Sequence, residues 1–428
     1  MRKLTLAAGI LLTSLLLSSY LPGSACSMYK VTQSGKTMVG CNHDTWNLTP
    51  RIWFETEGHG AGFTGARLDG AEGFAPQSGM NEYGLTFSRL AAATPESGSV
   101  TSGKKQILKP TTFLKDVLHR CKTVEDVKTY IDKYDHSTFI EDVFIYIDSS
   151  GNYLIVEPYS TTLGYDSTYV LANFCPSQIS DFGKIKQERY RKGKAFLQNK
   201  IDTSLAFCKA LSDTMHVCRA KIGDGTLLTS IWDLNERNVR LYFYHDYKHE
   251  VRFNLKEELS KGDHIIDALT LFPPNVEFTK LAEFKTPLNS PALDYFLRMC
   301  FLFFSGMAFY FLLSYFRSRK KSKYAKLKLA MIPLSIIMAY YMFVLGTTMN
   351  VFYFPAPYAD YKFSLLTVAA YIPFLILLLI IPLINMNRKV LKDKTWGFIS
   401  KGIYTINNIT YLVLIVLFTY WGLYNIFN

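Results

Sequence analysis

The sequence lacks the cysteine and histidine patterns of a metal site. Its seven cysteines form no C-x-x-C pair, and no cluster of histidines and cysteines has the spacing of a zinc site. We therefore expect no structural metal and no cofactor. The spacings do not resemble a dense disulfide framework either, although Cys208 and Cys218 could pair. Because seven is an odd number, one cysteine of an exported protein would keep a free thiol.

A basic tract that would bind nucleic acid is missing from residues 26–285. The formal net charge of the chain is +12, but two short loops near the C-terminus account for almost all of it. Their charged residues are Arg317, Arg319, Lys320, Lys321, Lys323, Lys326 and Lys328 in the first loop, and Arg388, Lys389, Lys392, Lys394 and Lys401 with Asp393 in the second. The basicity therefore belongs to these loops, and we expect no nucleic-acid partner.

Hydrophobic residues make up 49% of the chain, but they are unevenly distributed. From about Leu293 onward the sequence is close to continuously apolar, whereas residues 26–285 have the composition of a soluble domain. The boundary falls near Lys285-Thr286-Pro287. We predict a cleaved signal peptide at 1–25, an extracytoplasmic domain at 26–285 and a membrane domain at 286–428.

The first 25 residues have the three parts of a secretory signal. Arg2 and Lys3 form a charged start, residues 4–17 an apolar centre, and Gly23-Ser24-Ala25 a cleavage site. An uncleaved anchor is less favoured, because the apolar run of about 14 residues is shorter than the roughly 20 needed to span a bilayer. Lipoprotein processing is a second alternative, but Gly23 stands where a lipobox usually has a large apolar residue. We therefore expect plain cleavage before Cys26.

Residues 26–285 alternate between hairpins and helical stretches. Three hairpins are predicted where turn sequences separate strand-like runs, and four helices where apolar residues recur every three or four positions. The hairpins join Ser27–Val31 to Thr37–Gly40, Asp142–Ile147 to Tyr153–Glu157, and Thr226–Leu234 to Asn238–Tyr244; the helices are Thr111–His119, Val124–Tyr134, Lys184–Gln198 and Thr203–Met215. Tight hairpins between helices favour an α+β fold of antiparallel sheets packed with helices over a parallel βαβ fold.

Four segments of the C-terminal part are each long enough to cross a membrane, namely about 293–316, 327–351, 363–384 and 403–427. The two basic loops follow the first and third segments, and the loop between the second and third is nearly neutral. Since cytoplasmic loops carry the excess of lysine and arginine, both basic loops face inward. We therefore predict a multi-pass protein of the cell (inner) membrane, with its soluble domain and C-terminus on the extracytoplasmic side. The export signal requires the same orientation.

The predicted membrane helices show no pattern of carboxylates or histidines that would indicate a transporter or a proton path. Arg298 lies near the outer end of the first segment, where its side chain can reach the interface. We expect these helices to form an anchor or an assembly surface.

Cleavage before Cys26 would leave a thiol and a free α-amine on one residue. A thiol has a reference pKa of about 8.5 and an α-amine one of about 7.7–8.0, so both titrate near neutral pH. The amine can take the thiol proton as a general base, and the thiolate can then attack a carbonyl. Such a site also needs a group that orients the amine and donors for the oxyanion. The return strand of the first hairpin would bring Asp44 close to Cys26.

The soluble part resembles a known family, the N-terminal-nucleophile (Ntn) amide hydrolases of the choloylglycine hydrolase and penicillin V acylase type, with related acyltransferases and acid ceramidase-like enzymes. The resemblance covers about 26–260 and rests on short motifs that follow one another in the family's order. They are Cys26-Ser27, Gly40-Cys41-Asn42-His43-Asp44-Thr45-Trp46, Gly79-Met80-Asn81-Glu82-Tyr83-Gly84-Leu85, Ile147-Asp148-Ser149-Ser150-Gly151 running to Val156-Glu157, Val170-Leu171-Ala172-Asn173-Phe174, Arg189-Tyr190-Arg191 and Thr229-Ser230-Ile231-Trp232-Asp233-Leu234.

The resemblance implies an αββα sandwich in which antiparallel sheets lie between helices. It makes Cys26 the nucleophile and, through its amine, the base. Asp44 would orient that amine, and Asn173 would donate to the oxyanion. Asn81 is expected to fix a turn together with Glu82. The supporting residues are Asn42, Asn81 and Arg89.

Two positions depart from the family pattern. Cys41 stands where members commonly carry an arginine beside the nucleophile, which removes a cation that would favour the thiolate. Arg51, Arg67 or Arg89 could replace this arginine in space. Ala91 stands about where some members have a second contact for the oxyanion or substrate. We therefore do not transfer the bile-salt substrate to this chain.

The sequence leaves three functions open. The first, which we favour, is a membrane-anchored amidase that hydrolyses a linear carbon–nitrogen bond through an acyl-enzyme on Cys26. The second is an acyltransferase that passes the acyl group to an amine, and the third is a non-enzymatic lipoprotein or receptor domain lipidated at Cys26. The membrane anchor favours a small-molecule or lipid-like acyl amide as substrate and places membrane lipids nearby. The oligomeric state is not predicted.

Overall fold

The computed structural model describes residues 26–44, 47–92, 103–199, 201–219, 224–318, 322–348, 350–353 and 365–425. The predicted signal peptide and Thr45-Trp46 of the second motif lie outside these residues. The chain divides into two compact units, one ending at Ala282 and the other beginning at Glu283. Each unit is described by itself.

The first unit is built on two large antiparallel sheets. The smaller sheet has the strand order β14 (Thr168–Leu171), β1 (Ser27–Gln33), β2 (Lys36–His43), β17 (Leu228–Asp233), β18 (Asn238–Phe243) and β19 (Asp246–Asn254). The larger has the order β13 (Thr161–Gly164), β12 (Tyr153–Val156), β11 (Asp142–Ile147), β8 (Thr86–Ala91), β7 (Ser78–Asn81), β4 (Ala61–Gly65), β3 (Arg51–Glu55) and β20 (His264–Asp267). Every strand pair in both sheets is antiparallel.

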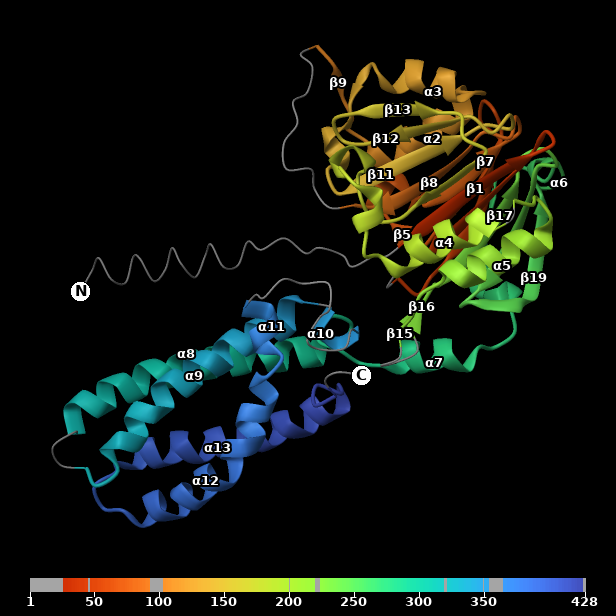
Figure 1. Ribbon diagram of the computed structural model, residues 1–428. Helices are drawn as coiled ribbons and strands as arrows, with labels where there is room; N and C mark the ends of the chain where they lie inside the picture. Colours follow the sequence, from red (N-terminus) through yellow and green to blue (C-terminus); the bar gives the residue numbers. More distant parts are fainter. Residues whose placement is uncertain are drawn as a thin grey trace. The chain divides into compact units, whose positions relative to one another are not determined.

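Helices cover the outer face of each sheet (Figure 1). The helices α4 (Glu188–Asn199) and α5 (Leu205–Met215) pack on β14 and β2, and α2 (Pro110–Arg120) and α3 (Val124–Ile131) pack on β7 and β12. One apolar cluster fills the space between the sheets and beneath α5, and another lies between the larger sheet and α2. The unit is therefore an α+β sandwich with the layer order helix, sheet, sheet, helix, which is the order that the family resemblance implies.

The three predicted hairpins are confirmed, and the first shows how its turn is made. Ser34 and Gly35 connect β1 to β2 with φ angles of 53° and 77°. Two consecutive residues with positive φ form the tight turn that matches the twist of antiparallel strands. The pairing of Gln33 with Lys36 across this turn fixes the register of the whole hairpin, including its far end at residue 26.

Two predicted helices differ from those in the structure. The helix predicted to run to Tyr134 ends at Ile131, because Tyr134 enters β10 (Tyr134–Asp135) and pairs with β9 (Lys105–Gln106). The helix predicted from Lys184 begins instead at Glu188, after a 3₁₀ turn that the Asp181 side chain caps through the amide of Gly183. In both cases the residues next to the helix form other hydrogen bonds, in a strand pair or a 3₁₀ turn, although their apolar spacing would also suit a helix.

Short elements complete the first unit. They are β5 (Arg67–Leu68), β6 (Phe74–Ala75), β15 (Cys218–Arg219), β16 (Asp224–Gly225), α6 (Leu255–Leu259), α7 (Val276–Glu283) and the 3₁₀ helices Gly70–Glu72, His136–Phe139, Pro176–Gln178, Phe182–Lys184 and Ala268–Leu271.

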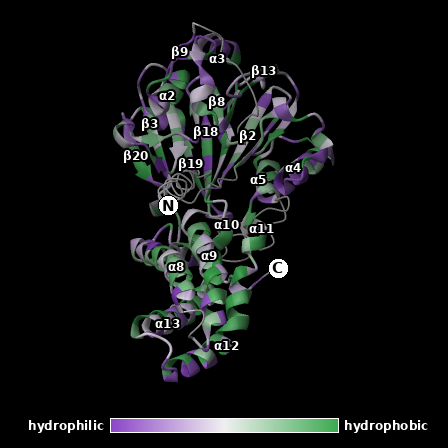
Figure 2. Cartoon of the chain, turned by 90° about the vertical axis from the view of Figure 1, so that its left-hand side faces the viewer, coloured by the Kyte–Doolittle hydropathy of each residue, from purple (hydrophilic) through white to green (hydrophobic). Residues whose placement is uncertain are grey.

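The second unit is helical and strongly apolar (Figure 2). Its helices are α8 (Pro291–Ser318), α9 (Ala325–Thr347), α10 (Asn350–Tyr353), α11 (Leu365–Ala369), α12 (Ile372–Lys392) and α13 (Phe398–Tyr420). Four stretches, 291–318, 325–347, 367–392 and 398–420, are long and apolar enough to cross a membrane, and they overlap the four predicted segments. Near the start of α8, Arg298 pairs with Asp294 one turn earlier at 2.9 Å. This ion pair gives the arginine a local partner on its own helix.

Candidate active site

Cys26 immediately precedes an interior strand of the smaller sheet. On one side of β1, Met28 pairs with Leu171 of β14, and on the other it pairs with Cys41 of β2. Continuing the register with β14 by two residues places Asn173 opposite Cys26. Asp44 directly follows the last residue of β2, so both neighbouring strands deliver a polar residue to the end where Cys26 lies.

The Cys26 side chain faces the space between the two sheets. Ser27 and Tyr29 face the other way, because the Ser27 hydroxyl donates to the Met215 carbonyl of α5 and the Tyr29 hydroxyl to the Cys208 carbonyl at 2.5 Å. Since side chains alternate along a strand, Cys26 points inward. Its Sγ lies 3.3 Å from Nε2 of Gln77, which comes from the other sheet just before β7. The thiol therefore lies inside the sandwich.

Burial suppresses ionisation of this thiol in the chain that still carries residue 25. Burial, followed by the negative charge of Asp44, raises the pKa of Cys26 to about 12, while the positive charge of Arg189 acts in the opposite direction. Sγ also lies 3.9 Å from the Asp44 carbonyl oxygen, within the range of a weak S–H···O hydrogen bond. At neutral pH the thiol is therefore protonated, and it needs a nearby base to become a nucleophile.

The Asp44 carboxylate is buried and oriented by a hydroxyl. Oδ1 accepts a hydrogen bond of 2.5 Å from Thr226, and the Thr226 oxygen in turn accepts the amide N–H of Val217 at 3.0 Å. Asp44 itself is only 2% exposed. The carboxylate is thus fixed beside residue 26, where an α-amine would find an anionic partner.

Asn173 is held by contacts from three directions. Its Nδ2 donates to the Ala91 carbonyl at 2.7 Å, and Gln187 contacts both its backbone amide, at 3.2 Å, and its carbonyl, at 3.0 Å. The Arg189 guanidinium donates to its Oδ1. Ala91 therefore anchors Asn173 through its backbone carbonyl.

Two arginines carry positive charge near Cys26. Arg189 lowers the pKa of the thiol, as described above. Arg89 binds Asp142 through two parallel hydrogen bonds of 2.9 and 2.8 Å. Burial lowers the pKa of Arg89, but Asp142 and, more weakly, Cys26 raise it, and the net shift is upward. Arg89 therefore stays charged.

The other two candidate replacements have partners of their own. Arg51 pairs with Asp267 at 2.8 Å, and Arg67 lies 4.0 Å from Asp69. Cys41 itself is buried. Burial raises the pKa of its thiol, hydrogen bonds with surrounding serine hydroxyls offset part of this rise, and the resulting pKa is about 12. A small neutral thiol thus occupies this position. Arg189, which the sequence offered only as part of a motif, joins Arg89 as a cation that interacts with Cys26.

Asn42 and Asn81 lie outside the immediate surroundings of the thiol. Asn42 faces the helix layer, where it donates to the Ser212 carbonyl at 3.0 Å and accepts from the Thr229 hydroxyl at 2.8 Å. Asn81 lies at the far end of β7, accepts from the amides of Tyr83 and Leu85, and donates to two carbonyls at the end of α2. Both amides connect secondary-structure elements, so we assign neither a chemical role.

A buried histidine lies in the same layer between the sheets. His43 Nε2 lies 3.3 Å from the Ser230 hydroxyl and 3.2 Å from the Ser78 hydroxyl. Burial lowers the pKa of His43 to about 3, so the ring is neutral. His43 also lines a cavity of about 30 Å³ together with Gln77, Arg67 and Leu227. This cavity reaches the residue that contacts the Cys26 thiol.

Gln77 and Gln187 are site residues that the sequence did not reveal. Gln77 belongs to no quoted motif and reaches Cys26 from the opposite sheet, across 51 positions of sequence. Gln187 lies in the segment before α4, outside the Arg189 motif. Only the three-dimensional pairing of the sheets and the packing of α4 identify them.

The solved structures that align with this chain include two kinds of enzyme. Two variants of conjugated bile acid hydrolase from Clostridium perfringens each align with 59% of this chain, with 16% identity, TM-scores of 0.43 and 0.44, and 97% and 99% of their own chains covered. Penicillin V acylase from Agrobacterium tumefaciens aligns with 56% of this chain and 91% of its own, with 14% identity and a TM-score of 0.43. These are the two types named by the sequence resemblance. The chain matches no protein-family model and no curated protein sequence.

Proposed function

We propose that the protein, once cleaved before Cys26, is an amidase that hydrolyses a linear acyl amide through an acyl-enzyme on the Cys26 thiol. The observation that carries this proposal is the meeting of three strand ends. Cys26, Asp44 and Asn173 come from adjacent strands of one sheet, and the register places them at the same end. A nucleophile, an anion for its amine and an amide donor are then within reach of one substrate carbonyl.

Cleavage supplies the base that the intact chain lacks. In the intact chain the nitrogen of residue 26 belongs to a peptide bond and cannot accept a proton. After cleavage it becomes an α-amine, which Asp44 holds and which takes the thiol proton. The thiolate bonds to the acyl carbon and the carbon–nitrogen bond breaks, with the ammonium returning its proton to the leaving amine. Water then cleaves the thioester and releases a carboxylic acid.

Donors from both sheets stabilise the charge that develops. We assign the oxyanion to the Asn173 amide, whose orientation Gln187 and Arg189 fix. Gln77 donates toward Sγ and so favours the thiolate over the thiol. The Arg189 charge acts in the same sense. Together these groups take over part of the task of the arginine that Cys41 replaces.

The position of the thiol also bears on the alternative of lipidation. Sγ lies between the sheets, in contact with Gln77 and the Asp44 carbonyl. A cysteine that carries a diacylglycerol must present the lipid chains to the bilayer, whereas this sulfur is enclosed between two sheets and Cys26 is only 3% exposed. The geometry therefore favours a nucleophile over a lipid anchor.

We further propose that the helices of the second unit hold the catalytic unit at the membrane on the extracytoplasmic side. The two basic loops support this orientation, because cytoplasmic loops carry the lysine and arginine excess. A site close to lipids would favour acyl amides with a long apolar chain. Equal activity on short water-soluble amides, with none on acyl lipids, would contradict that preference.

The proposal is tested by intact mass and by hydrolysis of a panel of acyl amides. We expect the purified protein to begin at Cys26, and Cys26→Ala to lose at least about a thousandfold in rate. A matched control is Cys121→Ala, which removes a different buried thiol and should keep the activity. An active protein that retains earlier residues, or an active Cys26→Ala variant, would contradict the proposal. Adding a free amine to the assay and analysing the products separates hydrolysis from acyl transfer.

A further inference from the structure

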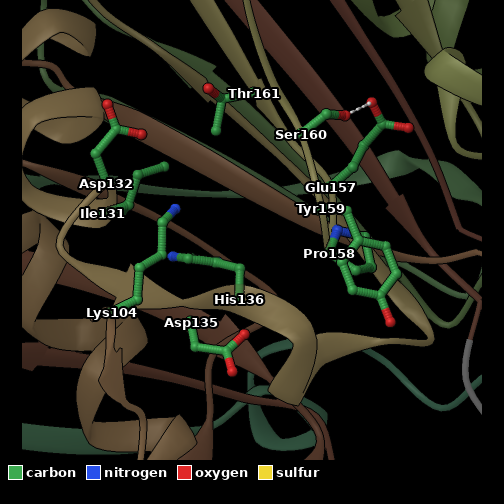
Figure 3. A pocket seen from close by; sticks show the side chains of 10 residues that line it. All are labelled: Lys104, Ile131, Asp132, Asp135, His136, Glu157, Pro158, Tyr159, Ser160 and Thr161. Carbon is green, nitrogen blue, oxygen red and sulfur yellow. Dashed lines mark hydrogen bonds between the residues drawn. The ribbon is translucent and has the colours of Figure 1, made fainter. Parts of the chain in front are cut away.

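A second cavity of the first unit, of about 90 Å³, lies beside the end of α3 and the connection from β12 to β13 (Figure 3). Its volume is several times the roughly 10–15 Å³ needed for one water molecule, so it has room for a small organic molecule. Lys104, Asp132, Asp135, His136, Glu157 and Thr161 contribute to its walls. None of these residues belongs to the Cys26 site.

His136 is a buried polar side chain of this wall that has no hydrogen-bond partner. It is 8% exposed, and neither ring nitrogen has a partner among the residues that the structure describes. Its ring packs edge-on against Phe113, with centroids 5.4 Å apart. Burial, followed by the charge of Lys104, lowers the pKa of His136 to about 4. The neutral ring therefore offers one donor and one acceptor for which the fold supplies no partner.

Lys104, Asp135 and Glu157 line the same cavity and make no ion pair among the residues that the structure describes. In the described part of the chain, Lys104 makes no ion pair, whereas Asp132 binds Lys128 at 2.6 Å. Asp135 and Glu157 are 6% and 3% exposed, and only neutral groups bind their carboxylates: Ser137 and Gln106 for Asp135, and Ser160 and Ser177 for Glu157. One cation and two buried anions thus border a single space.

We propose that this cavity binds a small zwitterion of the amino-acid type, with one ammonium and one carboxylate. The carboxylate would lie against Lys104 and the N–H of His136, and the ammonium against Asp135 and Glu157. The Asp135 carboxylate can accept about four hydrogen bonds, more than Ser137 and Gln106 supply. A simple anion would meet two uncompensated carboxylates, and a simple cation would meet Lys104. Only a ligand with both charges complements the wall.

Glycine is the probe that tests this site. Thermal unfolding of the full-length protein in detergent is followed with glycine, acetate or methylammonium at equal concentration and ionic strength. A ligand that binds only the folded state raises the midpoint. We expect glycine to raise it, and acetate and methylammonium each to produce less than about a third of that shift. No shift with glycine, or an equal shift with either single ion, would overturn the proposal.

Two variants and a control connect the shift to the cavity. Lys104→Met should weaken glycine binding by about tenfold or more, since it removes a charge-assisted contact. Lys105→Met changes the adjacent, exposed lysine and should leave the shift intact. His136→Phe keeps the ring and its contact with Phe113 and should also lose the shift. A full glycine response in Lys104→Met or in His136→Phe would refute the assignment.

Cys26→Ala should leave the glycine-induced shift of the unfolding midpoint unchanged. This variant therefore separates the test of the cavity from the test of the amidase proposal.

Discussion

Gln77 links the two sheets at Cys26. Its Nε2 lies 3.3 Å from the Cys26 Sγ and donates to the Arg89 carbonyl at 2.6 Å. One amide thus contacts the thiol of the smaller sheet while it is anchored to β8 of the larger. The distance between the two sheets at this end therefore determines whether the Gln77 amide reaches the sulfur.

Gln77→Leu should slow the reaction without unfolding the protein. A hydrogen bond to a charged group contributes about 1.5–3 kcal/mol, so we expect kcat to fall by roughly ten- to a hundredfold. The loss of a donor to the thiolate should also move the acidic limb of the pH profile of kcat/KM to higher pH. Gln178→Leu, an exposed glutamine on the same unit, is the control. A purely structural role for Gln77 would lower stability and leave the pH profile in place.

Asn173→Ala should lower kcat by about a hundred- to a thousandfold, as for other single oxyanion donors. Steady-state kinetics on the acyl amide that the wild type cleaves best would measure this loss. A small change in kcat with a large rise in KM would instead indicate that Asn173 binds the ground state.

Arg189→Met should act through Asn173 and through the thiol pKa. We expect kcat to fall about tenfold and the acidic limb of the profile to shift upward, because the Arg189 charge lowers the pKa of Cys26. Arg191→Met removes an exposed arginine two residues further along α4 and serves as a matched control. Equal behaviour of the two variants would argue against a role for Arg189.

Stability should fall as the pH is lowered from about 6.5 toward 3. The neutral ring of His43 has a folded-state pKa of about 3, below its ordinary value of 6.5. Between these values the unfolded chain binds a proton that the folded chain does not, so stability decreases with decreasing pH at up to about 1.4 kcal/mol per pH unit. His136 contributes in the same direction.

His43→Gln isolates the first of these contributions. The amide can still bind Ser78 and Ser230 but does not titrate. Denaturant unfolding at pH 7 and pH 4 should show a smaller difference for the variant than for the wild type. The same pH dependence in both proteins would assign the effect to other groups.

Gly40→Ala should destabilise the first unit. A Cβ at this position would overlap the ring of Tyr29. That ring cannot move aside, because its hydroxyl binds the Cys208 carbonyl at 2.5 Å and the Ser212 hydroxyl at 3.0 Å. Overpacking of this kind costs about 1–3 kcal/mol. Gly402→Ala, where an added Cβ meets nothing within 4 Å, should be tolerated in the same unfolding experiment.

Local sequence signals were sufficient to predict the hairpin next to Cys26 and the nearby Asp44, but not to place Asn173, which lies on a strand distant in sequence. The Ser34-Gly35 turn predicts the first hairpin, and counting back along its strands brings Asp44 to Cys26. The place of Asn173 depends on β14 pairing with β1 across more than 130 positions, which no local pattern contains. Its assignment from sequence therefore relied on the family resemblance.

The electrostatics around the thiol were the hardest part to anticipate. Three arginines were candidates to replace the cation missing at Cys41, and of these only Arg89 lies close enough to influence Cys26. Arg189 does so from α4, because that helix packs on β14. The packing of the layers decides which charges lie near a buried group. A single sequence does not reveal that packing directly.

The double-sided pairing of β1 has a practical consequence for making this protein. Residue 26 adjoins a strand flanked on both sides, so a newly exposed terminus there would be held in register rather than free to fray. The proposed mechanism tolerates no extension, since one additional residue would turn the amine back into an amide. By that mechanism we expect a recombinant chain that starts with methionine followed by Cys26 to be inert until that methionine is removed. A fusion tag belongs at the other end.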